Sequence, residues 1–222
     1  MMNLNLEQMR KGIAICDLDG TLTNKSLVLE HYGHLIKNDI VVDNGSYQAW
    51  AMDRKNEKLI VDCAMSYQKA ITGKTLSELD IFNFVSNFVS DDNNWNLDVM
   101  EHIEHLRDVE KYDITLITGS ADFLVQPLCE LLGFDCFATV YKRDLKTDRL
   151  TGDIVGMFAE GQKDECIKNN IDLHLYNDVI GYGDTSSDYG IFKHCTTNYL
   201  VHPTTETLKN LIVKNVKIEK IY

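Results

Sequence analysis

The chain has 222 residues, the size of one domain or of one domain with a modest insertion. Of these residues 44% are hydrophobic and 25% are charged, which excludes a disordered chain. The 34 acidic residues outnumber the 22 Lys and Arg residues, so the formal net charge is −12. Because an acidic surface repels nucleic acid and anionic lipid, we expect neither as a partner. A local cation still allows a small anionic molecule to bind in a cleft.

Membrane and secreted classes are also disfavoured. No run approaches 18 apolar residues, so we expect no membrane span. The first twelve residues contain no apolar run, so we expect no secretory signal and a cytoplasmic location. Six cysteines are scattered without a C-x-x-C pair, and we expect them to be reduced thiols that mostly pack in the core.

The first predicted element is a buried strand at 12–16, because Gly-Ile-Ala-Ile-Cys is an apolar run. Residues 24–110 differ in character, since their apolar residues recur at helical spacing and predict an almost wholly helical block. Helices are expected over 48–52 and 59–71, and Ser77 and Asn96 are predicted to cap two more. The apolar faces of these last two helices are predicted to contain Leu79, Phe82, Val85 and Phe88, and Leu97, Met100, Ile103 and Leu106.

Strand patterns return after residue 111 and alternate with helices. The apolar runs that predict strands lie at 114–117, 137–140, 179–182 and 198–201. Between them we expect a helix ending at Leu132, a hairpin over 141–154 and a helix that opens near Lys163, while the tail 216–222 fits an edge strand or a frayed end. The alternation predicts an α/β fold whose parallel sheet is formed by residues 1–23 and 111–222. Residues 24–110 would be inserted as a second, smaller, helical domain.

Polar residues directly follow three of the predicted strands. They form Asp17-Leu-Asp19-Gly-Thr21, Thr118-Gly119-Ser120 and Gly183-Asp184-Thr-Ser-Ser-Asp188. Ligands of open parallel sheets bind at the carboxyl ends of the strands, so these segments are expected to meet in one crevice. Four carboxylates gathered there cannot all stay ionised without a cation. An all-oxygen site suits a hard divalent ion, and we expect Mg²⁺.

These segments together carry a family resemblance. Asp17-Leu-Asp19-Gly-Thr21-Leu-Thr23, Thr118-Gly119-Ser120, Lys163 and Gly183-Asp184-x-x-x-Asp188 resemble the four motifs of the haloacid dehalogenase superfamily. The resemblance covers the whole chain, and within the superfamily the chain looks most like the branch containing phosphoserine phosphatase. It implies a Rossmann-like parallel sheet core (1–23 and 111–222). It also implies an all-helical cap domain (24–110) between the first and second motifs.

The resemblance implies a role for each motif residue. Asp17 would be the nucleophile that forms an aspartyl-phosphate, and Asp19 the acid that protonates the departing oxygen and later deprotonates water. The resemblance also implies that Mg²⁺ is bound by Asp17, Asp184 and the backbone carbonyl of Asp19. The phosphoryl group would be bound by Thr118, Gly119 and Lys163. Asp188 is expected to have an indirect role, in which it acts through a water molecule or orients Lys163.

The predicted cap provides expectations about the substrate. Phosphoserine phosphatases have a glutamate shortly after the first motif and a cap arginine, whereas this chain has Ser26 at that spacing and no arginine near Tyr67; the nearest is Arg54. Phosphoserine is therefore disfavoured, and a neutral or aromatic-friendly phosphate ester fits better. We also expect 24–110 to rotate as a unit over the Asp17 crevice and to set substrate choice.

The function predicted on these grounds is a magnesium-dependent phosphomonoester phosphatase that acts on a small phosphorylated metabolite. Two alternatives stay open: a phosphotransferase or phosphomutase of the same superfamily, and a catalytically silent phosphate-binding module. The pairs His31/His34 and His102/His105 could share a metal, but we expect them to be solvated. The aromatic residues Trp50, Tyr67, Phe82, Phe84 and Phe88 are expected to form cap core rather than a substrate pocket.

Overall fold

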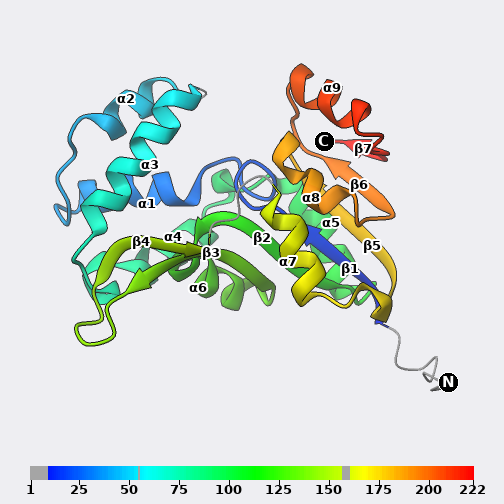
Figure 1. Cartoon of the computed structure of the whole chain (residues 1–222), viewed down its shortest axis with the longest axis horizontal. Coiled ribbons are helices and arrows are strands. Elements are labelled where there is room, and N and C mark those ends of the chain that lie inside the picture. Colours follow the sequence, from blue (N-terminus) through cyan, green and yellow to red (C-terminus); the bar gives the residue numbers. More distant parts are fainter. Residues whose placement is uncertain (1–9, 55, 157–160) are drawn as a thin grey trace.

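A computed structural model describes residues 10–54, 56–156 and 161–222. Within these ranges the strands form one seven-stranded sheet in the order β4-β3-β2-β1-β5-β6-β7 (Figure 1). The strands are β1 Arg10–Cys16, β2 Asp113–Ala121, β3 Asp135–Arg143, β4 Leu150–Gly156, β5 Tyr176–Gly183, β6 Thr197–Leu200 and β7 Lys220–Ile221. All neighbours are parallel except β3 and β4. The predicted α/β fold with a parallel sheet is therefore confirmed.

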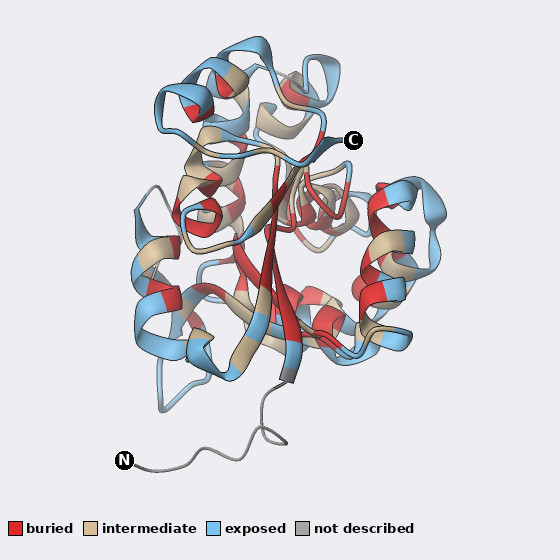
Figure 2. Ribbon diagram, turned by 90° about the vertical axis from the view of Figure 1, so that its right-hand side faces the viewer, coloured by how far each residue is buried: buried red, intermediate tan, exposed pale blue. Residues whose placement is uncertain are grey.

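The strands predicted from apolar runs are all present. β1 lies at the centre between β2 and β5, which agrees with its fully buried sequence. Figure 2 shows the central strands as the most continuously buried part of the chain. The predicted hairpin is the antiparallel β3–β4 pair. The tail 216–222, for which an edge strand and a frayed end were both open, contains the edge strand β7 beside β6.

Helices cover both faces of the sheet. They are α1 Leu27–Lys37, α2 Ser46–Met52, α3 Glu57–Ile71, α4 Ile81–Ser90, α5 Leu97–Asp108, α6 Asp122–Leu132, α7 Gln162–Asn170, α8 Tyr189–Phe192 and α9 Thr205–Val213. Side chains of a strand alternate between the two faces. Ala14 and Cys16 of β1 accordingly pack in the same cluster as α5 and α6, whereas Ile13 and Ile15 pack with α7 and α8.

Helices α1 to α4 occupy the segment inserted between β1 and β2, and two details of the prediction there are wrong. Ser77 does not cap α4: Thr75 and Glu78 form a capping box on a short 3₁₀ helix at Leu76–Leu79. Asp80, with φ 49°, then precedes α4. The buried face of α4 contains Phe84, Val85 and Phe88, which are spaced by three and four residues. Phe82 lies off this face and is 74% exposed, so its predicted place on the apolar face is wrong.

Helix α5 begins after Asn96 as predicted, but the Asn96 side chain does not cap it and instead donates to the carbonyl of Thr21 over 2.7 Å. The helix packs on the sheet. Its Met100, Ile103 and Leu106 are buried, whereas Leu97 is 56% exposed, so the expected burial of Leu97 is wrong. The Nδ1 atom of His102 on α5 lies 2.8 Å from the hydroxyl of Tyr182 on β5. The division of the chain into a core of 1–23 plus 111–222 and a cap of 24–110 stays a prediction. The contacts of α5 join that helix to the sheet.

The inserted segment also contacts the β3–β4 hairpin through its backbone. The N–H of Gly73, just after α3, donates to the carbonyl of Leu150 over 2.8 Å, and the N–H of Leu150 donates to the carbonyl of Lys74 over 2.9 Å. These hydrogen bonds join the inserted segment to the sheet at a point separate from the two chain connections near residues 23–26 and 111–113. A rotation of residues 24–110 as a unit, which stays a prediction, would have to break them.

The cysteines and the helices agree with the remaining composition-based expectations. All six cysteines are free thiols, and Cys16, Cys63, Cys129 and Cys166 are buried. Among the described residues, every helix is too short or too polar to cross a membrane.

Candidate active site

The site is formed where β1, β2 and β5 end. Asp17 follows β1, and its N–H still donates to the carbonyl of Tyr182 over 3.0 Å, which extends the pairing with β5 and fixes the backbone of Asp17. The chain then turns at Gly20, whose φ is 86°. A Cβ at Gly20 would overlap the carboxylate of Asp184, so only glycine suits both the turn and this close approach.

Lys163, in the first turn of α7, joins two of the acidic motifs. Its Nζ donates to Oδ1 of Asp17 over 2.6 Å and to Oδ1 of Asp188 over 2.7 Å. Lys163 is only 3% exposed. Burial disfavours its charged form, but the two carboxylates outweigh burial and raise the pKa of Lys163, so that the side chain stays a cation.

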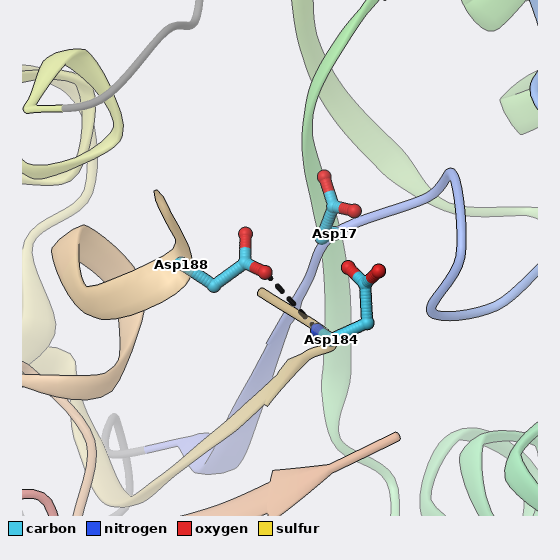
Figure 3. Close-up of side chains that lie close together, drawn as sticks. All are labelled: Asp17, Asp184 and Asp188. Carbon is cyan, nitrogen blue, oxygen red and sulfur yellow. Dashed lines mark hydrogen bonds between the residues drawn. The ribbon is translucent and has the colours of Figure 1, made fainter. Parts of the chain in front are cut away.

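Asp188 has partners on both carboxylate oxygens. Oδ1 accepts from Lys163, and Oδ2 accepts from the N–H groups of Asp184 over 3.0 Å and Thr185 over 2.9 Å (Figure 3). Asp188 therefore orients Lys163 and the backbone that carries Asp184. This arrangement matches the second of the two contacts expected for Asp188, although its role in a reaction stays a prediction.

Asp17 and Asp184 are less completely paired. Figure 3 shows the Asp184 carboxylate directed towards that of Asp17, and the Thr21 hydroxyl lies 3.4 Å from Oδ2 of Asp17 and 3.2 Å from Oδ1 of Asp184. Burial, together with the neighbouring carboxylates, raises the pKa of Asp17 to about 7 and that of Asp184 to about 8; Lys163 acts in the opposite direction. A divalent cation would remove this repulsion.

The donor atoms fit Mg²⁺. One carboxylate oxygen from each of Asp17, Asp184 and Asp188 lies within 4.8 Å of the others, and this is the one such acidic, Cys or His group among the residues that the structure describes. The donors are all oxygen, which Mg²⁺ prefers. Both oxygens of Asp188 accept hydrogen bonds of 3.0 Å or less, whereas Oδ2 of Asp17 and Oδ1 of Asp184 accept from the Thr21 hydroxyl over longer distances of 3.4 and 3.2 Å. Asp17 and Asp184 are therefore the side chains that could hold the ion. The expected contact from the carbonyl of Asp19 stays a prediction.

Asp19 is held separately from this cluster. Its Oδ1 accepts from the N–H of Leu27, the first residue of α1, over 2.7 Å, and its Oδ2 accepts from the Ser120 hydroxyl over 2.6 Å. Burial raises the pKa of Asp19, and these hydrogen bonds limit the rise. Sequence reasoning named Ser120 only as the end of the second motif and missed Leu27. The place of Ser120 at the carboxyl end of β2, beside the end of β1, was the signal that could have assigned it to Asp19.

An irregularity in β2 exposes Gly119 of the second motif. Thr118 pairs with Ala138 and Ala121 pairs with Thr139, so the residues between them bulge out of the ladder. The Thr118 side chain is fully buried and accepts from the Ser120 N–H over 3.1 Å. Gly119 is exposed to the adjoining cavity. The structure thus brings Thr118 and Gly119 to the same sheet end as Asp17, Asp19, Lys163, Asp184 and Asp188, whose roles stay predictions.

The expectation that the histidine pairs are solvated is wrong for His31. This side chain is fully buried. Its Nε2 lies 2.8 Å from the carbonyl of Leu79, which can only accept, so Nε2 carries the proton and Nδ1 accepts from the Tyr67 hydroxyl over 2.9 Å. His34 instead pairs with Asp80 over 2.8 Å. Tyr67 is core, as expected.

Comparisons with known proteins were made on sequence and on structure. No curated protein matches the sequence. The structure resembles a protein of unknown function from Bordetella pertussis Tohama I (TM-score 0.67, 14% identity, covering 94% of this chain and 98% of that chain). It also resembles a phosphoserine phosphatase in apo form, with a TM-score of 0.63 and 18% identity over 96% of this chain and 94% of that chain. A third similar structure is cytosolic 5'-nucleotidase IIIB bound to cytidine, with a TM-score of 0.58 and 11% identity over 95% of this chain and 80% of that chain.

At these identities the structural likeness demonstrates a shared fold. The family assignment comes from the sequence: the model of the haloacid dehalogenase-like hydrolases matches residues 14–193, which include all four motifs. The expected resemblance is confirmed, and this chain belongs to the haloacid dehalogenase-like hydrolase family.

Proposed function

We propose that this protein is a magnesium-dependent phosphomonoester phosphatase that acts on a small phosphorylated metabolite through an aspartyl-phosphate on Asp17. The observation that carries the proposal is the pairing of Asp17 with Lys163 beside Asp184, with Asp19 held apart from them by Leu27 and Ser120. Asp17 would thereby be oriented for attack, and Asp19, held by the Leu27 N–H and the Ser120 hydroxyl, would transfer protons. Structural neighbours that include a phosphoserine phosphatase and a 5'-nucleotidase support this class of activity.

In the first half-reaction a carboxylate oxygen of Asp17 attacks phosphorus. The new oxygen–phosphorus bond forms as the bond from phosphorus to the ester oxygen breaks. Asp19 gives its proton to that departing oxygen, and the alcohol leaves. The raised pKa of Asp19, caused by burial, favours the protonated form that this step needs. Lys163 remains charged and balances negative charge on the phosphoryl oxygens, as do the Thr118 hydroxyl and the Gly119 N–H.

In the second half-reaction water attacks the aspartyl-phosphate. Asp19, now ionised, takes a proton from the water, and the phosphorus–oxygen bond to Asp17 breaks to release inorganic phosphate and the free carboxylate. Atoms and charge balance because Asp19 regains the proton that it donated. Mg²⁺, held by Asp17, Asp184 and the carbonyl of Asp19, would supply the positive charge that lets a carboxylate approach a phosphate dianion.

The test is hydrolysis of an aryl phosphate with Mg²⁺ and with a chelator in its place. We expect release of inorganic phosphate only with the metal, and a fall of at least about a thousandfold in kcat for Asp17→Asn, which removes the nucleophile. Asp153→Asn, at an exposed carboxylate on β4, is the matched control and should keep the wild-type rate. An Asp17→Asn variant with wild-type activity would overturn the mechanism.

The same first half-reaction would serve a phosphotransferase or phosphomutase, and product analysis separates these from a phosphatase. A phosphatase releases inorganic phosphate from a sugar phosphate, whereas a mutase returns an isomer of it. A silent phosphate-binding module would release neither product.

A further inference from the structure

Helix α3 has two apolar faces, and only one of them is packed. Cys63, Tyr67 and Ile71 lie on one face and are at most 1% exposed. Val61 and Met65 lie on the adjoining face and are 56% and 52% exposed, and Ile60, at the edge between the two faces, is 36% exposed. Apolar side chains that are gathered on one exposed face mark a surface that binds something.

This second face forms the wall of a cavity that begins at the motif residues. The cavity has a volume of about 310 Å³ and runs from Asp19, Gly119 and Ser120 along α3 to the β3–β4 hairpin. Val28 of α1 and Ile154 of β4 complete the apolar wall. Whatever occupies the cavity therefore has one end at the residue expected to protonate a departing ester oxygen.

The charge of the lining is distinctive. Among the described residues, Asp19 is the one charged side chain that lines this cavity, and Gln68 and Tyr141 are polar neighbours. Gln68 already donates to the carbonyl of Gly152. A carboxylate on a substrate would lose its hydration here without meeting a cation, and an ammonium group would have as its charged partner only Asp19, which already accepts hydrogen bonds from Leu27 and Ser120.

A second cavity, of about 550 Å³, also reaches Asp19 and shares Ser26, Leu29 and Ile60 with the first, but its other lining residues differ. It contains Lys25 and Arg54 and extends to Asp184. Arg54 is not free to clamp a carboxylate, because its Nη1 donates to Glu30 over 2.7 Å and its guanidinium stacks on Trp50. The charged groups around Asp19 thus lie on the side of Asp184, where the phosphoryl group and metal are expected, and the apolar groups lie along α3.

Building on the phosphatase activity proposed above, we propose that the substrate is the monophosphate ester of an uncharged, largely apolar alcohol. Its organic part lies on the α3 face formed by Ile60, Val61 and Met65. A cavity of about 310 Å³ has room for a single ring or a short branched chain.

The test compares benzyl phosphate, glycerol 2-phosphate and phosphoserine as substrates in the presence of Mg²⁺. We expect kcat/KM for benzyl phosphate to exceed that for each of the others by at least about tenfold. Val61→Asp places a carboxylate on the apolar face and should reduce this preference by about 10- to 100-fold. Val42→Asp makes the same change at a position that is 89% exposed and lies outside the cavity, and it should keep the preference within about twofold.

Binding of benzylphosphonate, measured by calorimetry, gives a readout that needs no turnover. If no ester is hydrolysed but benzylphosphonate binds and Val61→Asp weakens it, the phosphatase function fails while the apolar site stands. If hydrolysis occurs but the polar esters equal benzyl phosphate, or Val61→Asp leaves the ranking unchanged, the apolar site is wrong. If there is neither hydrolysis nor binding, both proposals fail. Unfolding curves for Val61→Asp and Val42→Asp that match the wild type show that both variants are folded.

Discussion

The acidic cluster at the ends of β1 and β5 and the exposed face of α3 both adjoin Asp19, yet they are built in opposite ways. In the cluster, Lys163 and Asp188 are almost fully buried, and Nζ of Lys163 donates to Oδ1 of Asp188 over 2.7 Å. On α3, Val61 and Met65 are half-exposed side chains of a helix whose packing depends on its other face. We therefore expect substitutions at the residues assigned to chemistry to lower the stability of the fold, whereas substitutions at the residues assigned to substrate choice should leave it nearly unchanged.

The largest expected difference between the two regions is in stability. Lys163→Met removes the cation that pairs with Asp17 and Asp188 and leaves buried carboxylates without a partner, so we expect the free energy of unfolding to fall by about 3–5 kcal/mol. Val61→Asp should change it by less than about 0.5 kcal/mol. Urea denaturation without metal measures both variants. Lys168→Met, at an exposed lysine of the same helix, is the control. A loss below about 1 kcal/mol for Lys163→Met would remove the contrast.

Buried His31 extends the comparison into the inserted helices. Burial lowers its pKa to about 4, against about 6.5 in the unfolded chain. Below pH 6.5 the unfolded state therefore binds a proton that the folded state does not, and stability is lost as the pH falls from 6.5 towards 4, by about 3 kcal/mol in total. Unfolding of wild type and His31→Gln across this range measures the effect. The difference between them should shrink as the pH falls, whereas His174→Gln, at an exposed position, should follow the wild type.

The contact between the hairpin and the end of α3 should give the smallest effect. A Cβ added at Gly152, with φ 89°, would lie 2.7 Å from Oγ1 of Thr72, whereas one at Gly45, with φ 93°, would meet nothing within 4 Å. Both Gly→Ala changes carry backbone strain. Gly152→Ala should lose about 1–3 kcal/mol more than Gly45→Ala, because it also overpacks. Thr72→Ala combined with Gly152→Ala should recover that excess. Equal losses for the two single variants would show that the hairpin does not press on α3.

The sheet and most of the acidic site could be predicted because they depend on local sequence. Asp17, Thr118 and Asp184 each follow a buried apolar run, and parallel strands bring such positions to one edge. Lys163 could be expected from its place at the start of a helix. Its simultaneous bonds to Asp17 and Asp188 agree with the predicted orientation of Lys163 by Asp188.

The inserted region was harder to predict because its details depend on tertiary contacts. Thr75 rather than Ser77 forms a cap, on the short 3₁₀ helix before α4. Phe82 is exposed because the face of α4 that packs contains Phe84, Val85 and Phe88. An amphipathic pattern does not specify which surface a helix covers, so the packing of α5 on the sheet could not be deduced. The bond from Leu27 to Asp19 joins a backbone N–H to a carboxylate, and backbone groups leave no signal in sequence.

The most direct test of the central claim is to identify the atom that carries the phosphoryl group during turnover. Enzyme mixed with ³²P-labelled benzyl phosphate and Mg²⁺ is quenched in acid within milliseconds, and its peptides are analysed by mass spectrometry. The account predicts one phosphoryl group on the peptide that contains Asp17, formed before phosphate is released and absent in Asp17→Asn. Label on any other residue, or steady turnover with no labelled enzyme at any time, would contradict it.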